Sequence, residues 1–360
     1  MLKKIDRYII GKYLGTFIYA ILLFSAISVV IDLADRIDDF LENNLSLFAI
    51  FKGYYANFVP YIIFFLSPLF IFIAVIFFTA QLANRSEIIA ITSSGVSFYR
   101  LLFGPYLISA IILTLVQLYG NHYWVPMANQ TRYVFEDSYI KKKRVTTDRN
   151  LHIKMDSDNY VYVESFNFKD TVGRRFTVEK IIDRHLLQKL SADRIVWKGE
   201  KKQWRLENYF ERKLDSLKET LRQGETLDTV LNLNPNDFQY QVNYKECMTT
   251  PALTAFMQKE IEKGAPFIEF YQVELYRRTA TPFATFILTA IGLAIASRRV
   301  RGGMGLHIAW GIGLSSVYIM LLQFSTTFAT NGSLPPLLAV WTPNIIFFLL
   351  SIYLVLKAQK

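Results

Sequence analysis

Residues 302–356, GGMGLHIAWGIGLSSVYIMLLQFSTTFATNGSLPPLLAVWTPNIIFFLLSIYLVL, are 55 consecutive residues without one Asp, Glu, Lys or Arg. A helix that crosses a bilayer needs about 20 apolar residues, so this stretch is too long for one span and suits two. Asn331-Gly332-Ser333-Leu334-Pro335-Pro336 divides it with residues that interrupt helices. The stretch therefore predicts a membrane hairpin, and the chain is expected to be a membrane protein.

Other charge-free runs predict four further spans. The chain is 52% hydrophobic and 15% aromatic, which is more apolar than a soluble enzyme needs. Residues 1–121 are expected to hold three spans and a short cytoplasmic helix at 84–97, and residues 276–360 are expected to hold three more. The six predicted spans lie near residues 11–31, 57–81, 101–121, 279–297, 305–329 and 338–356.

The block from 122 to 275 reads as a separate domain made mostly of strands. Tyr160-Val161-Tyr162-Val163 has the residues that strands prefer, and a polar turn at 198–202 separates two apolar segments. A second turn is expected at 234–237, and a helix is expected from Pro251 to Gly264. Several short strands favour a sandwich or jelly roll. The apolar face of the expected helix is formed by Leu253, Phe256, Met257 and Ile261.

The distribution of charge predicts the orientation of the chain. The net charge is +10, but residues 121–275 hold 25 basic and 23 acidic side chains, a net of only +2. The excess lies at the membrane edges, which argues against nucleic-acid binding. By the positive-inside rule, both termini and the loops at 82–100 and 298–303 are expected in the cytoplasm, and residues 122–275 on the other side. The basic run at 141–144 is expected to be a solvated face of that domain.

The sequence lacks common motifs for nucleotide binding, hydrolysis and metal binding. There is no Gly-x-x-x-x-Gly-Lys-Ser/Thr, no His-Glu-x-x-His and no Gly-x-Ser-x-Gly, and the four histidines and Cys247 have no metal-ligand spacing. Gly302-Gly303-x-Gly305 is read as close helix packing rather than a nucleotide loop. The predicted spans hold no ionisable residue suited to a proton or sodium relay except His307, which argues against ion-coupled transport and intramembrane hydrolysis. No cofactor or metal is expected.

Residues 81–97 carry the strongest local signal. They predict a short amphipathic helix between two spans, on which Ile88, Ile89 and Ile91 pack down while Arg85 and Glu87 face a partner. Gly95 is expected to end the helix. An ordinary interfacial helix is the alternative interpretation.

Arg85-Ser86-Glu87 followed by Ser94-Gly95 resembles the coupling segment of the LptF/LptG (YjgP/YjgQ) permease family of lipopolysaccharide export. Of the two paralogues, LptG is the more similar in residues 6–9 and 84–87. The resemblance covers nearly the whole chain, through Ile5-Asp6-Arg7-Tyr8-Ile9, Pro60, Pro68, Arg277-Arg278-x-x-x-Pro282, Leu334-Pro335-Pro336 and Trp341-x-Pro343-Asn344.

The resemblance implies a role, a location and partners. It implies an inner-membrane permease that pairs with a second permease of the family on an LptB-like ATPase dimer. The complex would extract lipopolysaccharide and pass it to an LptC-like bridge protein. Residues 122–275 would be a periplasmic β-jellyroll-like domain, Glu87 would contact the ATPase with support from Arg85, and the first and fifth spans would form lateral gates. The chain itself would not be an enzyme.

Four arginines at the predicted outer edge are candidates for binding the anionic head group of the lipid. They are Arg36, Arg132, Arg277 and Arg278. Anchoring of helices by interfacial arginines is the alternative. The neighbours Arg277 and Arg278 are costly together unless an anion offsets them. The acidic residues from Asp32 to Glu42 depart from the lysines that LptG proteins often carry there.

Two other functions stay open from the sequence. A non-transporting envelope scaffold would use residues 122–275 to dock a partner. An intramembrane enzyme is the weakest alternative, since the sequence has no catalytic constellation.

Overall fold

The computed structural model describes residues 3–140, 147–155, 158–167, 170–182, 185–199, 203–215, 218–231, 233, 235, 242–262, 268–298 and 303–358. The chain divides into two compact units. The helical unit comprises Met1–Ile140, Lys245–Leu253 and Glu269–Lys360, and the sheet unit comprises Lys141–Tyr244 and Thr254–Ile268. The prediction of a helical membrane protein with an inserted sheet domain is confirmed.

Helices account for the described part of the helical unit. The first are α1 (Lys4–Glu42), α2 (Leu47–Ile50), the π-helical turn η1 (Phe51–Tyr55), α3 (Ala56–Phe65), α4 (Ser67–Asn84) and α5 (Glu87–Ser93). A run of segments follows: α6 (Phe98–Leu101), η2 (Leu102–Tyr106), α7 (Leu107–Tyr119), η3 (Gly120–Trp124), α8 (Val125–Phe135) and η4 (Glu136–Ile140). After the strands come η6 (Val242–Cys247), α9 (Thr250–Glu262), α10 (Ile268–Ala296), α11 (Gly303–Thr330) and α12 (Pro336–Ala358).

Seven helices of the described residues are long and apolar enough to cross a membrane. The seventh arises because the predicted second span is divided at Leu66, where α3 ends and α4 begins with Pro68 in its first turn. The third helical run continues to Ile140, beyond the expected end at 121. The unbroken charge-free, mostly apolar sequence gives way to polar residues from Asn121 onward, so apolarity marks the end of the span and not the end of the helix.

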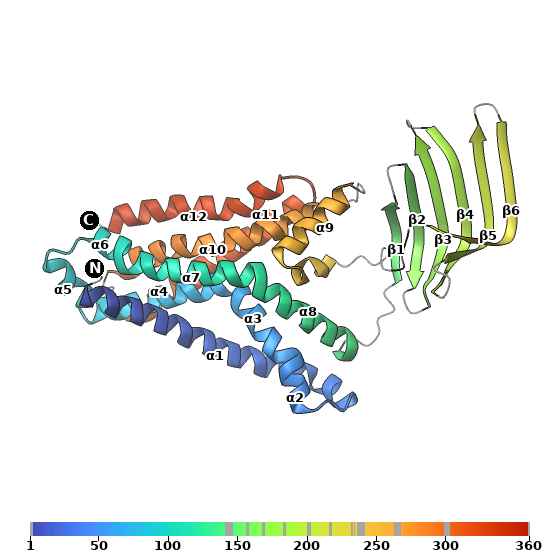
Figure 1. The fold of residues 1–360 in the computed structure, drawn as a ribbon. Helices are drawn as coiled ribbons and strands as arrows, with labels where there is room; N and C mark the ends of the chain where they lie inside the picture. The colour runs from blue at the N-terminus through green and yellow to red at the C-terminus, as the bar shows by residue number, and fades with distance from the viewer. Residues whose placement is uncertain are drawn as a thin grey trace. The chain divides into compact units, whose positions relative to one another are not determined.

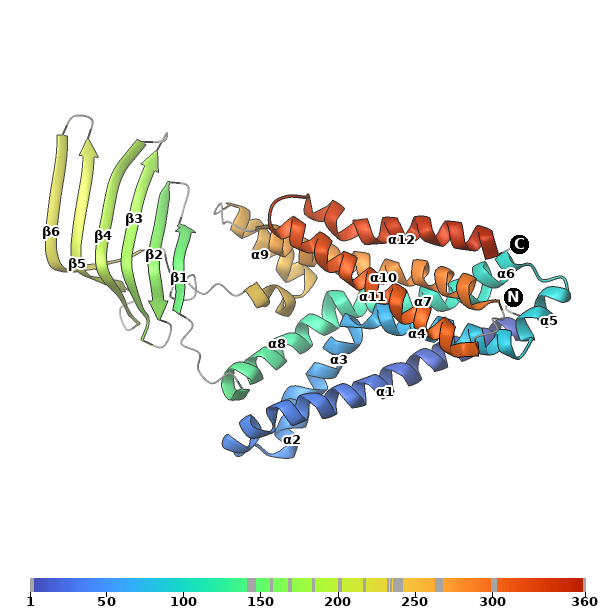
Figure 2. The ribbon, with the colours of Figure 1, turned by 180° about the vertical axis from the view of Figure 1, so that it is seen from behind.

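Figure 1 shows both ends of the chain at one end of the helical unit, where α5 and α6 also lie. The turn between α11 and α12 is the one predicted from Asn331–Pro336, with Gly332 at φ +75° and Pro336 as the first residue of α12. The view from behind shows α11 beside α12 and crossing α4, and both pairs are in contact (Figure 2). The C-terminal hairpin is thereby packed on α4.

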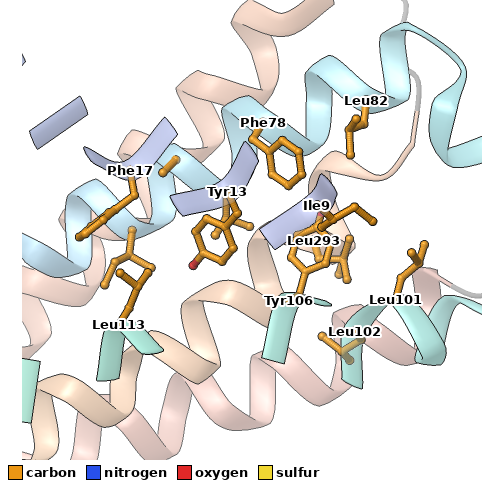
Figure 3. Close-up of a cluster of buried hydrophobic side chains, with 14 of the residues drawn as sticks. Ile9, Tyr13, Phe17, Phe78, Leu82, Leu101, Leu102, Tyr106, Leu113 and Leu293 are labelled. Atoms are coloured by element: carbon orange, nitrogen blue, oxygen red, sulfur yellow. The ribbon is translucent and has the colours of Figure 1, made fainter. Parts of the chain in front are cut away.

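The largest buried cluster of the helical unit lies where α1 meets α4, the η2 turn and α10 (Figure 3). Tyr13 of α1 is fully buried, and its hydroxyl lies 2.8 Å from Oγ1 of Thr289. The Tyr106 hydroxyl makes the same kind of contact with Thr79 at 2.8 Å. Both phenol hydroxyls are thus hydrogen-bonded inside an otherwise apolar core, as buried polar groups must be.

The sheet unit is built from one antiparallel sheet of six described strands in the order β1-β2-β3-β4-β5-β6. The expected strand at 160–163 lies in β2, and the expected strand–turn–strand is the β4–β5 hairpin. The basic run at 141–144, turn residues 200–202, the turn at 234–237 except Pro235, and Gly302 lie outside the described residues. The strands are β1 (Thr147–Lys154), β2 (Asn159–Asn167), β3 (Val172–Ile182), β4 (His185–Lys198), β5 (Gln203–Asp215) and β6 (Lys218–Thr229).

A transverse row of polar residues interrupts the pairing of all five neighbouring strand pairs. Arg175 and Asn208 in this row have φ angles of 49° and 51°, outside the strand region. The alternation of inward-facing and outward-facing residues therefore shifts by one residue at this row. On β5, Trp204 and Leu206 are buried on one side of the row, and Tyr209 packs on the core on the other. The row consists of Asn150, Glu164, Arg175, Asp193, Asn208 and Glu225.

Trp204 supplies a testable anchor for the sheet core. Its side chain is fully buried, and its indole Nε1 donates a hydrogen bond of 2.8 Å to the carbonyl of Leu233. Trp204→Phe should cost about 1–3 kcal/mol, because it leaves that carbonyl unsatisfied. Amide hydrogen exchange of β4 and β5 in the full chain measures the loss. Trp197→Phe is the control, because the Trp197 indole donates no hydrogen bond within the described residues; an equal loss in both variants contradicts the assignment.

Candidate functional sites

The predicted coupling segment is a seven-residue helix with an irregular residue at each end. α5 spans Glu87–Ser93, shorter than the expected 84–97, because Asn84 ends α4. Ser86 precedes the helix at φ +60°, and Gly95 follows it at φ +88°. The helix therefore ends at Ser93, two residues before Gly95, the residue predicted to end it. Only glycine adopts the backbone conformation of Gly95 without cost.

The side chains of α5 divide into a packed face and a free face. Ile88 is buried, and Ile91 packs on the same core cluster. Ile89 is 54% exposed, so its prediction as a packing residue is wrong. The reason is that a helix this short buries only the two positions three residues apart. Arg85 is exposed and Glu87 is half-buried.

Glu87 has a partner in its own chain. Its Oε2 accepts a hydrogen bond of 3.1 Å from the hydroxyl of Tyr8 on α1. Since this contact is exposed, the carboxylate retains surface toward solvent. The residue predicted to meet an ATPase therefore also contacts the first span.

Arg277 and Arg278 share one internal anion, Glu274. Arg277 Nη2 lies 2.7 Å from Glu274 Oε2, and Arg278 Nε lies 3.1 Å from Oε1. Arg278 also donates to Thr250 Oγ1 at 3.1 Å and to the carbonyl of Lys245 at 2.9 Å. The side chain of Arg278 is 3% exposed and that of Arg277 is 33% exposed. The offsetting anion expected for this pair is thus part of the chain.

Arg36 and Arg132 meet at a second carboxylate, Glu136. Arg132 Nε lies 3.7 Å and Arg36 Nη2 lies 4.0 Å from Glu136 Oε1. The Arg132 guanidinium is 3.9 Å from the centre of the Tyr61 ring, a cation–π contact, and its side chain is 6% exposed. Arg36 has 27% of its side chain exposed and pairs with Asp32 at 2.9 Å. Asp32 of the unusual acidic stretch therefore neutralises Arg36.

Glu246 connects the two groups, because both Arg132 and Arg277 act electrostatically on its carboxylate. Burial, and then the negative charge of Glu274, raise the pKa of Glu246. Burial also lowers the pKa of Lys245 and raises the pKa of Cys247 to about 12. The structure thus places the four predicted arginines in two groups, Arg36 and Arg132 on Glu136 and Arg277 and Arg278 on Glu274, with Glu246 acting on one arginine of each group.

The sequence interpretation did not identify these glutamates. The only signal was spacing: Glu274 lies four residues before Arg278, and Glu136 lies four residues after Arg132. Arg132 and Arg278 are buried as parts of the helix packing. Arg36 and Arg277 are the two of the four with surface for a ligand.

An apolar cavity of about 570 Å³ lies between α1, the η1–α3 region and α7–η3. Two of its polar side chains are hydrogen-bonded: Ser67 donates to Gln117 Oε1 at 3.0 Å, and Gln117 Nε2 donates to Thr285 at 2.8 Å. The remaining surface is suited to hydrocarbon. The lining residues are Phe17, Ile21, Val29, Phe51, Tyr55, Ala56, Val59, Pro60, Ile63, Phe64, Ser67, Leu113, Val116, Gln117 and Trp124.

Comparison with known proteins agrees with this architecture over nearly the full length. Residues 7–357 match the family described as Lipopolysaccharide export system permease LptF/LptG. The chain is 21% identical over 357 residues to the Lipopolysaccharide export system permease protein LptG of Escherichia coli strain K12, covering 98% of both chains. An uncharacterized protein of Aquifex aeolicus is 24% identical over 200 residues, covering 54% of this chain and 55% of that protein. With its apolar helices and inserted sheet, the chain is a multi-pass inner-membrane protein that belongs to the LptF/LptG family of lipopolysaccharide export permeases.

Proposed function

We propose that this chain is a permease subunit of an ABC-type lipopolysaccharide exporter, closer to LptG than to LptF. ATP hydrolysis would belong to an LptB-like ATPase dimer, because the sequence of this chain has no P-loop. A second permease of the family would complete the membrane body. The observation that carries the proposal is α5, a short helix whose half-buried Glu87 keeps surface toward solvent, at the same end of the helical unit as both termini (Figure 1).

The end that carries α5 is proposed to be cytoplasmic. Arg85, Arg100 and Lys357 lie there together with the basic N-terminal residues, which is the distribution that the positive-inside rule requires. The sheet unit is then periplasmic, since the chain leaves the helical unit after Ile140 at the other end of the bundle. An LptC-like bridge protein is its proposed partner.

Lipopolysaccharide is the proposed ligand of the four arginines and of the apolar cavity. Arg36 and Arg277 offer partly exposed guanidinium groups for an anionic head group. The cavity offers an apolar surface for acyl chains, with its polar residues Ser67 and Gln117 hydrogen-bonded to each other. These two features fit the two ends of an amphipathic anion.

Purification from native membranes in mild detergent, followed by mass spectrometry, tests the proposal. The expected result is recovery of a P-loop ATPase and a second six-span permease, with lipopolysaccharide in the lipid fraction. The sheet unit is compact by itself, which is the observation that favours an envelope scaffold as the second candidate. A preparation that contains a periplasmic protein but neither an ATPase nor a permease supports the scaffold and contradicts the exporter.

A further inference from the structure

Asp6 fastens the first turn of α1 to the third helical run. Its carboxylate is 6% exposed, and Oδ2 accepts from Arg100 Nη2 at 2.7 Å and from the backbone N–H of Lys3 at 2.9 Å. A buried carboxylate with two such partners fixes both position and angle of the helix that carries it. The start of α1 is therefore held by Arg100 of the third helical run, which lies 94 residues further along the chain than Asp6.

Arg100, the other member of this ion pair, lies against a kink in the third helical run. Gly104 has φ −91° and ψ −106°, which is not helical, and Pro105 follows it. A Cβ at position 104 would collide with the Arg100 guanidinium. The guanidinium thus lies against a break in the helix, so Arg100 links Asp6 to a point where the third run can bend.

The same first turns of α1 also contact α5. Tyr8 donates to Glu87 at 3.1 Å, and Ile9 shares a buried cluster with Ile88 and Leu101; Figure 3 shows Ile9 and Leu101 of this cluster. From there α1 continues without interruption to Phe17, Ile21 and Val29, which line the apolar cavity. At 1.5 Å per residue, Asp6 and Val29 are about 35 Å apart along one helix.

We propose that the Asp6–Arg100 ion pair is the coupling element between α5 and the cavity. It makes the start of α1, α5 and the η2 kink one rigid body, so that a displacement of α5 tilts α1 along the cavity wall. Without the pair, Tyr8 and Ile9 still contact α5, but the start of α1 is no longer held against the third run, so α1 does not tilt as one body when α5 moves. Asp6 and Arg100 are positioning residues for transport, and this inference rests on the proposed function.

The test uses the complex purified with its ATPase and second permease, reconstituted with lipopolysaccharide in proteoliposomes. Asp6→Asn and Arg100→Gln should each raise the ATP hydrolysed per lipopolysaccharide transferred to the periplasmic acceptor by about tenfold, the factor that a charged hydrogen bond supplies. ATPase retention and basal hydrolysis should stay at wild-type levels. Lys4→Gln, which removes an exposed charge from the same turn of α1, is the matched control.

The double variant and a conservative variant separate coupling from mere stability. If the two residues act through each other, Asp6→Asn with Arg100→Gln is no worse than either alone. Arg100→Lys, which keeps the charge at a side chain 42% exposed, should restore most of the coupling. Should Asp6→Asn fail to fold, Arg100→Gln carries the test.

The outcomes distinguish two failures. A wild-type chain that retains no ATPase overturns the proposed function and this inference together. A wild-type complex that transfers lipid, while the single variants do so at unchanged ATP cost or the double variant adds their effects, overturns this inference alone.

Discussion

Glu274→Gln should lower the free energy of unfolding of the helical unit by about 3–5 kcal/mol, the cost of removing one partner from a buried ion pair. Glu274 is 7% exposed and is the carboxylate between Arg277 and Arg278. Arg278 is nearly fully buried, so its charge has no access to water once the carboxylate is gone. A glutamine retains hydrogen bonding to one guanidinium but compensates neither charge. Equilibrium unfolding of the chain in mixed micelles measures the change.

Glu269→Gln is the matched control for this variant, since it removes a half-buried carboxylate from the first turn of the same helix, α10. Its effect should stay within about 0.5 kcal/mol, as for surface substitutions away from buried networks. Equal unfolding free energies for wild type and Glu274→Gln would show that the two arginines are stabilised in another way.

The sequence was sufficient for the spans because apolar length is a direct requirement of the bilayer. The runs at 305–329 and 338–356 lie within α11 and α12, and the turn between them is at the predicted residues. The division of the second predicted span at Leu66 was harder to predict from the sequence, because Pro60 lies inside α3 while Pro68 lies in the first turn of α4. A proline marks where a helix can break, and packing decides which proline is used.

The site was predicted only in part, because charge pairing depends on the fold. The four arginines were selected individually for their place near span ends, whereas Glu136, Glu246 and Glu274 assemble them. Glu246 lies in a short helix after the sheet unit, far in sequence from Arg132. Alternation in the strands predicted β2 but not the row of interrupted pairs, since the left-handed φ of Arg175 has no sequence signature.

Glu87→Lys should weaken binding of the ATPase by about 2–5 kcal/mol, the usual effect of removing one member of a buried charge pair at an interface. The expectation follows from the proposed function: α5 is too short to bind through a large buried area, and it presents Glu87 and the exposed Ile89 beside Arg85, which lies two residues before the helix. The charge reversal should abolish export while leaving membrane insertion intact. Retention of the ATPase on the tagged chain, measured across ATPase concentrations, gives the change in affinity.

Tyr8→Phe shows whether Glu87 acts on the ATPase or only within its own chain. This variant removes the 3.1 Å hydrogen bond to Glu87 and leaves the carboxylate in place. If the carboxylate contacts the ATPase, Tyr8→Phe retains the ATPase near wild-type affinity and Glu87→Lys does not. Equal losses in both variants would assign Glu87 to positioning α1, and full retention with normal export in Glu87→Lys would remove it from the coupling site. The comparison is decisive because the two residues share one hydrogen bond but only one of them carries a charge.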